Sequence, residues 1–288
     1  MKHLLMRFPG GRTHAVTLRY DDSITCDLKL ADMMRRYGVR GTFNIISGRL
    51  AKEERECAPG TWASLTPKQC LEVMGDDMEL AMHSYTHPML GKMPPAEVMR
   101  EVLADKEMLE RITGQVIRGL AYPYSSYNDE TVQVLKECGV SYARTVQDTR
   151  RFDVPKDWMR MPTTCHHKDP QLMALAEAFL KPVGRYGDCK LFYLWGHSYE
   201  FEKDRNWHIM EEFLPFIGGH DYVWYATNIE ICDYVEAYRR LQWSVGRTMV
   251  YNPSAIDVDA CWHDLDHPER SVHFHIPAGQ TVKVPVVE

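Results

Sequence analysis

Residues 15–22 read Ala-Val-Thr-Leu-Arg-Tyr-Asp-Asp, a run of strand-forming side chains that ends in two adjacent carboxylates. β-branched and aromatic side chains favour a strand, and the polar pair at its end favours a loop. Two other apolar runs also end in polar clusters, His83-Ser84-Tyr85-Thr86-His87 and Trp195-Gly196-His197. In α/β proteins the loops after the carboxyl ends of parallel strands build functional sites. These three clusters are therefore the first candidates for such a site.

The segments around these clusters alternate between strand and helix patterns. Strands are expected at residues 15–20, 41–46, 78–82, 120–122, 141–146 and 190–195. Helices are expected at residues 25–37, 66–75, 94–113, 128–138, 170–180 and 228–241. This alternation favours parallel strands joined by crossover helices, which is an α/β fold. Short strands between turns replace it from residue 249 onward, so we expect a main domain at residues 1–245 and a β-rich extension at 246–288.

The composition of the chain disfavours several classes of protein. Its 288 residues carry 34 basic and 40 acidic side chains, a net charge of −6 that disfavours binding to a nucleic-acid backbone. A membrane span needs about 18 apolar residues in a row, which the sequence lacks, and residues 1–7 are too short for a signal peptide. The 8 cysteines include no Cys-x-x-Cys pair, which disfavours a disulfide framework. We expect a cytoplasmic protein that binds neither nucleic acids nor membranes.

Two histidines four residues apart, together with a carboxylate from another loop, match a His₂Asp metal set. His83, His87 and one of the Asp21–Asp22 pair could hold a divalent ion and leave a position open for water. Each part also has a simpler explanation, because such histidines can be ordinary core or surface residues and such aspartates can form a turn or a helix cap. Repulsion between the adjacent carboxylates favours the metal, since it calls for a cation or a shared proton.

Four motifs occur in an order that resembles a known family. They are Tyr20-Asp21-Asp22, His83-Ser84-Tyr85-Thr86-His87, Tyr122-Pro123-Tyr124 and Leu194-Trp195-Gly196-His197. Together they resemble the polysaccharide deacetylases, which form carbohydrate esterase family 4 (the NodB-homology group). The resemblance implies a distorted (β/α) barrel of about seven parallel strands. It also implies a metal-dependent hydrolase that removes an acetyl group from an N-acetylated sugar or oligosaccharide.

The resemblance assigns the metal ligands to Asp22, His83 and His87. They would bind one divalent ion, for which zinc is favoured and cobalt, nickel or iron is also accommodated. Such an ion polarises the acyl carbonyl and lowers the pKa of a bound water molecule.

The resemblance also assigns the groups that move protons and contact the substrate. Asp21 would be the general base and His197 the general acid that protonates the leaving amine. The backbone N–H of Tyr124 would help to hold the oxyanion. The residues assigned to substrate binding are Tyr122, Pro123, Arg160 and Trp195.

The sequence departs from the family pattern in the third motif. The family's arginine, three residues before the tyrosine of that motif, is replaced by Ala121. Arg160 could reach Asp21 instead, although an ordinary surface arginine is an equal alternative. The pair Asp157-Trp158 matches the family's Asp-Trp motif only superficially.

Several alternatives stay open at this point. His166-His167 could line the cleft, with solvated or structural imidazoles as the alternative. A set of aromatic residues could form a wall for a sugar ring, with core packing as the alternative for at least half of them; that set is Trp195, Tyr199, Phe201, Trp207 and Trp224. The same site could instead hydrolyse a small cyclic amide or ureide, or the protein could bind carbohydrate without catalysis. The C-terminal strands could pair with a second copy of the chain in a homo-oligomer or could cap this one.

Overall fold

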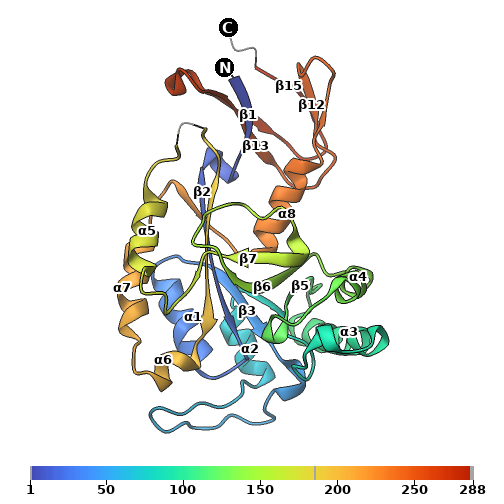
Figure 1. Ribbon diagram of the computed structural model, residues 1–288, viewed down its shortest axis with the longest axis vertical. Helices are drawn as coiled ribbons and strands as arrows, with labels where there is room; N and C mark the ends of the chain where they lie inside the picture. The colour runs from blue at the N-terminus through green and yellow to red at the C-terminus, as the bar shows by residue number, and fades with distance from the viewer. Residues whose placement is uncertain (1, 185, 286–288) are drawn as a thin grey trace.

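The predicted parallel strands form one sheet that curves into a nearly closed barrel in the computed structural model (Figure 1). The structure describes residues 2–184 and 186–285. The strands of this sheet are β2 (His14–Asp21), β3 (Gly41–Ile45), β4 (Glu79–Met82), β5 (Gly119–Ala121), β6 (Tyr142–Asp148), β7 (Met161–Thr163), β8 (Cys165–His166), β9 (Lys190–His197) and β10 (Val223–Tyr225). Their order is β7-β6-β5-β4-β3-β2-β9-β8, and β10 pairs with the first part of β2.

One short segment joins the two ends of this sheet. Only Thr164 separates β7 from β8, yet β7 pairs with β6 while β8 pairs with β9 on the opposite side. If β7 and β8 are counted as one interrupted strand, the barrel has eight parallel strands including β10. The predicted distorted (β/α) barrel is therefore confirmed, with one short strand more than the resemblance implied.

Helices cover the outside of the barrel (Figure 1). They are α1 (Cys26–Arg36), α2 (Pro67–Met74), α3 (Pro95–Thr113), α4 (Asp129–Glu137), α5 (Leu172–Leu180), α6 (Tyr199–Lys203), α7 (His208–Ile217) and α8 (Asn228–Arg239). Local chemistry sets their ends: Thr66 and Gln69 form a capping box at the start of α2, and Gly114, with a φ of 68°, ends α3. The helices predicted from apolar spacing agree with these bounds to within about two residues.

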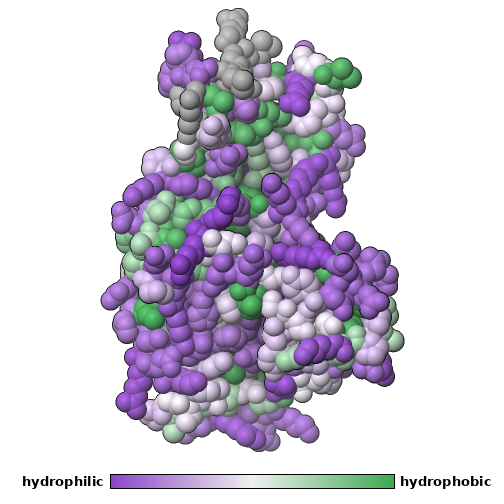
Figure 2. All heavy atoms as spheres, in the orientation of Figure 1, coloured by the Kyte–Doolittle hydropathy of each residue, from purple (hydrophilic) through white to green (hydrophobic). Residues whose placement is uncertain are grey.

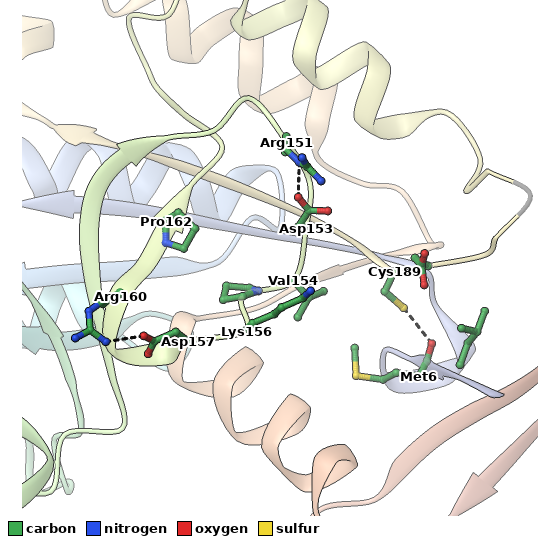
Figure 3. Close-up of a pocket in the computed structure, with 12 residues that line it drawn as sticks. Met6, Arg151, Asp153, Val154, Lys156, Asp157, Arg160, Pro162 and Cys189 are labelled. Atoms are coloured by element: carbon green, nitrogen blue, oxygen red, sulfur yellow. Dashed lines mark hydrogen bonds and ion pairs between the residues drawn. The ribbon is translucent and has the colours of Figure 1, made fainter. Parts of the chain in front are cut away.

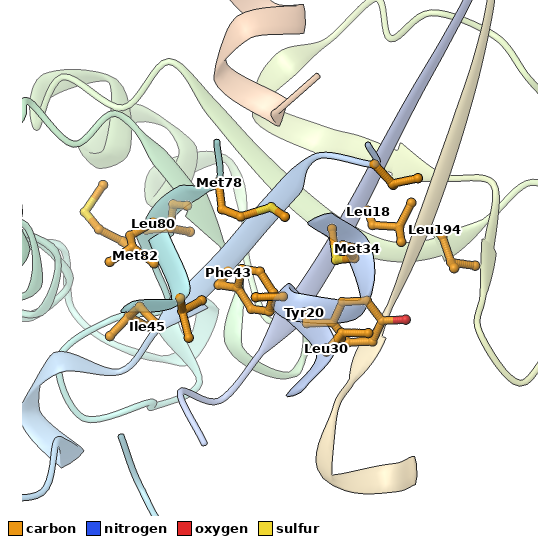
Figure 4. Close-up of a cluster of buried hydrophobic side chains, with 14 of the residues drawn as sticks. Leu18, Tyr20, Leu30, Met34, Phe43, Ile45, Met78, Leu80, Met82 and Leu194 are labelled. Carbon is orange, nitrogen blue, oxygen red and sulfur yellow. The ribbon is translucent and has the colours of Figure 1, made fainter. Parts of the chain in front are cut away.

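The main hydrophobic core lies between the barrel and the helices. Alternate side chains of β2, Val16, Leu18 and Tyr20, pack outward against Leu30 and Met34 of α1 (Figure 4). Side chains of a strand alternate between its two faces, so Thr17, Arg19 and Asp21 point into the barrel. Those three are all buried. The barrel interior therefore holds charged groups directly below the end of β2.

Two small antiparallel sheets form the predicted β-rich extension, at the end of the barrel away from the carboxyl ends of the strands (Figure 1). One consists of β1 (Lys2–Arg7), β13 (Val258–Asp264) and β14 (Val272–Ile276), and the other of β11 (Gln242–Trp243), β12 (Met249–Tyr251) and β15 (Thr281–Lys283). The first sheet includes the N-terminal strand, in which Lys2 is the register partner of Asp264. Apolar spacing did not predict that β1 would be a strand. The boundary at residues 245/246 stays a prediction.

The surface is mostly hydrophilic over the barrel, and apolar side chains gather over the antiparallel sheets (Figure 2). None of the helices in the described part of the chain has the length and apolar character needed to span a bilayer.

Candidate active site

The three polar clusters meet at the carboxyl ends of β2, β4 and β9, where the backbone is strained. Nine non-glycine residues of the described chain have a positive φ, and six of them are in the loops after β2, β4 and β5. These six are Asp22, Ser23, Ser84, His87, Tyr124 and Ser125. A positive φ costs free energy in a residue with a side chain, so its concentration in three neighbouring loops points to a functional site.

Asp22, His83 and His87 bring their polar atoms together. The Nε2 atoms of His83 and His87 are 3.1 Å apart, and Asp22 Oδ1 lies 3.7 Å from each of them. Four ligands around a zinc-sized ion, with bonds of about 2.1 Å, are separated by about 3.4 Å in tetrahedral geometry. The three donors therefore have the spacing, as well as the chemistry, of a divalent metal site with one position left for another ligand.

Two contacts fix the orientation of His83. Its Nδ1 lies 2.9 Å from the carbonyl oxygen of Ala121, to which it must donate because a carbonyl only accepts. This bond leaves the lone pair of Nε2 free to face a metal, as in other metal-binding histidines. The Asp105 carboxylate of α3 accepts hydrogen bonds from the backbone N–H of His83 at 3.0 Å and of Ser47 at 2.9 Å. Burial lowers the pKa of His83 well below its ordinary value, which keeps the ring neutral.

Asp21 is buried below this triad between two arginines. Arg19, two residues earlier on β2, bonds one carboxylate oxygen, and Arg144 of β6 bonds the other. Both guanidinium groups are almost completely buried, and Asn44 accepts from Arg19 Nε at 2.5 Å. Burial raises the pKa of Asp21 to about 6, against the opposing effect of the Arg19 charge. The carboxylate is therefore held in place and kept basic enough to accept a proton near neutral pH.

His197 ends β9 beside Asp21, its register partner on β2. Its Nε2 lies 3.9 Å from Asp22 Oδ2, and its Nδ1 lies 3.6 Å from Oε2 of Glu200 in α6. Burial alone would lower the pKa of His197, but the interaction with Glu200 and the charges of Asp21 and Asp22 outweigh it and raise that pKa above its ordinary value. One nitrogen thus faces the site, and the other faces a carboxylate.

Glu200 is a functional candidate that the motifs did not reveal. Its carboxylate also lies 3.1 Å from His166 Nε2, 3.3 Å from His167 Nε2 and 3.0 Å from Lys168 Nζ. His167 is buried against Gly196, where any added Cβ would overlap the imidazole ring. The Lys168 ammonium occupies one side of the carboxylate, so this cluster is better explained as an ion-pair network around His197 than as a second metal site.

Glu200→Gln is expected to lower the rate of the reaction by roughly 10- to 100-fold, because His197 loses the charge that orients and stabilises its protonated form. The matched control is Glu202→Gln in the same helix, whose carboxylate accepts from Trp207 Nε1 and lies away from His197. Equal activity in the two variants would show that Glu200 does not contribute to the reaction.

The third motif has one exposed and two buried residues. Tyr124 is 62 % exposed, and its ring lies 4.5 Å from that of His87. Tyr122 and Pro123 are buried, and the Tyr122 hydroxyl donates to the carbonyl of Met159 at 2.9 Å. Both side chains therefore support the loop from below, and the expectation that Tyr122 and Pro123 touch the substrate stays a prediction.

Arg160 does not reach Asp21. It lies in the short helix η5 (Trp158–Arg160), and its guanidinium pairs with Asp157 at 2.8 Å and with Asp129 of α4. Arg160 and Asp157 line a cavity that also contains Cys189, the residue before β9, and so extends toward the opposite end of the strand from His197 (Figure 3). The Asp157-Trp158 pair likewise makes no contact with His197, since the Trp158 indole donates to Glu236.

The remaining aromatic candidates divide between the site and the core. Trp195 is partly buried below the site, where its indole donates to Asp148 at 2.7 Å and its ring lies 4.7 Å from the Arg144 guanidinium. Phe201 and Trp207 are buried in the main core, and Trp224 packs against Phe8 near the extension. Tyr199 lies at the site, because it lines the same cavity as Asp22.

Comparison with known sequences finds similar deacetylases. Residues 9–143 match the family model described as polysaccharide deacetylase. The chain is 25% identical over 151 residues to a chitooligosaccharide deacetylase from Bradyrhizobium sp. (strain ANU 289), which covers 51% of this chain and 60% of the relative. It is 21% identical over 165 residues to the peptidoglycan-N-acetylmuramic acid deacetylase PdaC of Bacillus subtilis (strain 168), which covers 54% of this chain and 30% of that one. The match thus spans less than two thirds of each relative.

Solved structures share the fold. A candidate polysaccharide deacetylase from Mycobacterium smegmatis superposes with a TM-score of 0.58 at 18% identity, covering 83% of this chain and 96% of that chain. A family 4 acetyl xylan esterase from Clostridium thermocellum, solved in complex with a cobalt ion, gives a TM-score of 0.50 at 14% identity, covering 75% and 89%.

Proposed function

Because residues 9–143 match the family model described as polysaccharide deacetylase, we propose that this chain is a metal-dependent hydrolase that removes the acetyl group from an N-acetylated sugar. The two curated relatives are named for N-acetylated sugars, a chitooligosaccharide in one case and peptidoglycan N-acetylmuramic acid in the other. The observation that carries the proposal is the convergence of Asp22, His83 and His87 directly above the buried Asp21.

We propose that Asp22, His83 and His87 hold one divalent ion, with zinc the favoured metal. The nitrogen and oxygen donors suit zinc, cobalt, nickel and iron, and the bond from His83 to the Ala121 carbonyl presents the correct nitrogen. A bound ion of this kind supplies Lewis acidity to an acyl carbonyl and acidity to a water molecule.

The chain's own residues supply the proton transfers. Asp21, held by Arg19 and Arg144, accepts the proton of the attacking water. His197, whose raised pKa keeps it protonated to higher pH, donates a proton to the departing nitrogen. The backbone N–H of Tyr124, in the strained turn beside His87, is the proposed donor to the oxyanion.

Acetate release from a panel of N-acetylated mono- and oligosaccharides tests the proposal. We expect release from at least one N-acetylated sugar after loading with zinc or cobalt, and none after chelation. The panel includes small cyclic amides and ureides, whose hydrolysis in place of the sugars would contradict the proposed substrate class. Sugar binding without acetate release from any substrate would contradict catalysis.

His83→Ala is expected to abolish both metal binding and turnover. Removing one of three ligands, together with the ring that faces the other two, should lower the bound metal from one ion per chain to less than about a tenth of that value. Elemental analysis of the purified protein measures this ratio. The control is His220→Ala, whose ring nitrogen contacts the Phe216 carbonyl away from the triad and whose loss should leave the metal content unchanged. If the His83→Ala protein retained its metal, His83 would not be a metal ligand.

A further inference from the structure

A cavity of about 550 Å³ lies beside the triad of Asp22, His83 and His87, and Asp22 is one of the residues that line it. The cavity opens between the loop after β2 and the long connection from η2 (Ser47–Arg49) to α2, which spans residues 50–66. That connection extends below the barrel, at the end where the strands terminate (Figure 1). A substrate whose acetyl group reaches the triad would place its neighbouring atoms in this cavity.

One wall of the cavity is aromatic. Trp62 and Tyr199 both line it, and their rings stack at 5.0 Å between centroids with an angle of 26°. Trp62 is 38 % exposed although it is large and apolar, so part of its aromatic surface is accessible to solvent. Such a flat, exposed aromatic surface suits the apolar face of a sugar ring.

Apart from Asp22, the proposed metal ligand, the charged side chains that line the cavity are positive. Its charged lining residues are Asp22, Arg49 and Arg55, and the remaining lining residues are uncharged. Within residues 2–184 and 186–285, neither arginine forms an ion pair with a carboxylate. Arg49 Nη2 donates to the carbonyl of Thr86 at 2.7 Å, which anchors the guanidinium beside the loop that carries His83 and His87.

Several arginines elsewhere in the described chain do pair with carboxylates. Arg35 pairs with Asp77, Arg118 with Asp233 and Arg150 with Asp169, each within 3.0 Å. A guanidinium fork binds carboxylate or phosphate with two parallel hydrogen bonds, so an unpaired arginine in a cavity is suited to an anionic ligand. Two such groups beside an aromatic wall would select for a sugar that also carries a negative charge.

We propose that Arg49 and Arg55 bind an anionic substituent of the substrate, so that the protein prefers an acidic N-acetylated sugar over a neutral one. This inference rests on the proposed deacetylation and specifies its substrate class. The charge would be carried by a carboxylate or a phosphate on the acetylated sugar or on the residue next to it, and the aromatic wall would contact the ring.

The test compares pairs of substrates in which one member carries an anionic group and the other does not. An oligosaccharide that contains N-acetylmuramic acid is assayed against its methyl ester, and N-acetylglucosamine 6-phosphate is assayed against N-acetylglucosamine. For at least one pair, kcat/KM should be roughly 10- to 100-fold higher for the anion, since a hydrogen bond to a charged group contributes about 1.5–3 kcal/mol. The pair that shows the preference identifies the carboxylate or the phosphate as the charged group.

The arginines are tested with Arg49→Gln, Arg55→Gln and the double variant. The double variant should raise KM for the anionic substrate and bring the anion-to-neutral ratio of kcat/KM to within about two-fold of one. Arg36→Gln is the matched control, because Arg36 is an exposed arginine in the last turn of α1 outside the cavity. An absence of preference in both pairs would overturn the inference, and so would a preference that persists in the double variant.

Failure of this inference can be separated from failure of the proposed function. If no substrate releases acetate, deacetylation is contradicted, and calorimetric titration of each pair then measures binding to the wild-type chain and to the double variant. Tighter binding of the anion that disappears without the two arginines would still support the anionic subsite. Equal affinity for both members of each pair would overturn it independently of catalysis.

Discussion

Asp21→Asn is expected to lower kcat by about 1,000-fold or more while the bound metal is retained. The amide has nearly the shape of the carboxylate, but it cannot accept a proton from the attacking water. Asp22, His83 and His87 are unchanged, so the metal content should remain at one ion per chain. A variant with near wild-type kcat would show that Asp21 is not the base.

This variant also creates an electrostatic defect that must be controlled. Arg19 and Arg144 are buried against Asp21, and removal of its charge leaves both without a counter-ion. Breaking a buried ion pair by removing one partner typically costs about 3–5 kcal/mol, so Asp21→Asn should also be less stable. The double variant Asp21→Asn/Arg144→Met removes one cation along with the anion, and it should recover part of the free energy of unfolding without recovering activity. Circular dichroism during urea unfolding measures this recovery.

Asp105→Ala is expected to lower the free energy of unfolding by about 1–3 kcal/mol, because it leaves the buried backbone N–H of Ser47 without an acceptor and leaves that of His83 with the Ile45 carbonyl alone. Both groups donate to this carboxylate, which is fully buried in α3. The loop after β4 loses its anchor at the same time, so metal affinity should fall as well. Urea unfolding measures the first effect, and metal titration measures the second.

Two comparisons sharpen this experiment. Asp105→Asn keeps one oxygen as an acceptor, and its loss of stability should lie between that of the wild type and that of Asp105→Ala. Glu107→Ala changes an exposed carboxylate of the same helix that pairs with Arg111 at 2.9 Å, and it should alter stability by less than about 0.5 kcal/mol. Similar losses for Asp105→Ala and Glu107→Ala would show that Asp105 does not hold the two loops.

The fold was largely predictable because its signals are local. Apolar spacing, proline at the first turn and glycine after the last turn located α2, α3 and α4, and β-branched runs located the strands between them. The helices α6 and α7 and the strand β1 were not predicted, and for β1 the reason is a distant partner. β1 is a strand because β13 pairs with it more than 250 residues later, and no pattern within residues 2–7 reveals that partner.

The residues of the candidate site were predictable where they belong to one of the sequence motifs. Asp22, His83 and His87 lie together as the resemblance implied, whereas their roles remain proposals. Arg160 was misplaced because sequence distance says nothing about which arginine reaches a given carboxylate. A usable signal was present for Arg19, since a charged residue in the middle of an apolar strand is rarely buried without a partner. Glu200 had a weaker signal, its position three residues after His197.

The register of β5 and β6 has a consequence for how such proteins are recognised. Ala121 stands where the resemblance implies an arginine, and its register partner on β6 is Arg144, whose guanidinium reaches Asp21. Arg144 thus supplies a positive charge to Asp21 from the neighbouring strand. A search that scores arginine in the third motif alone would miss this charge. We expect surveys of inactive homologues to misclassify such chains unless they evaluate the neighbouring strand together with the motif.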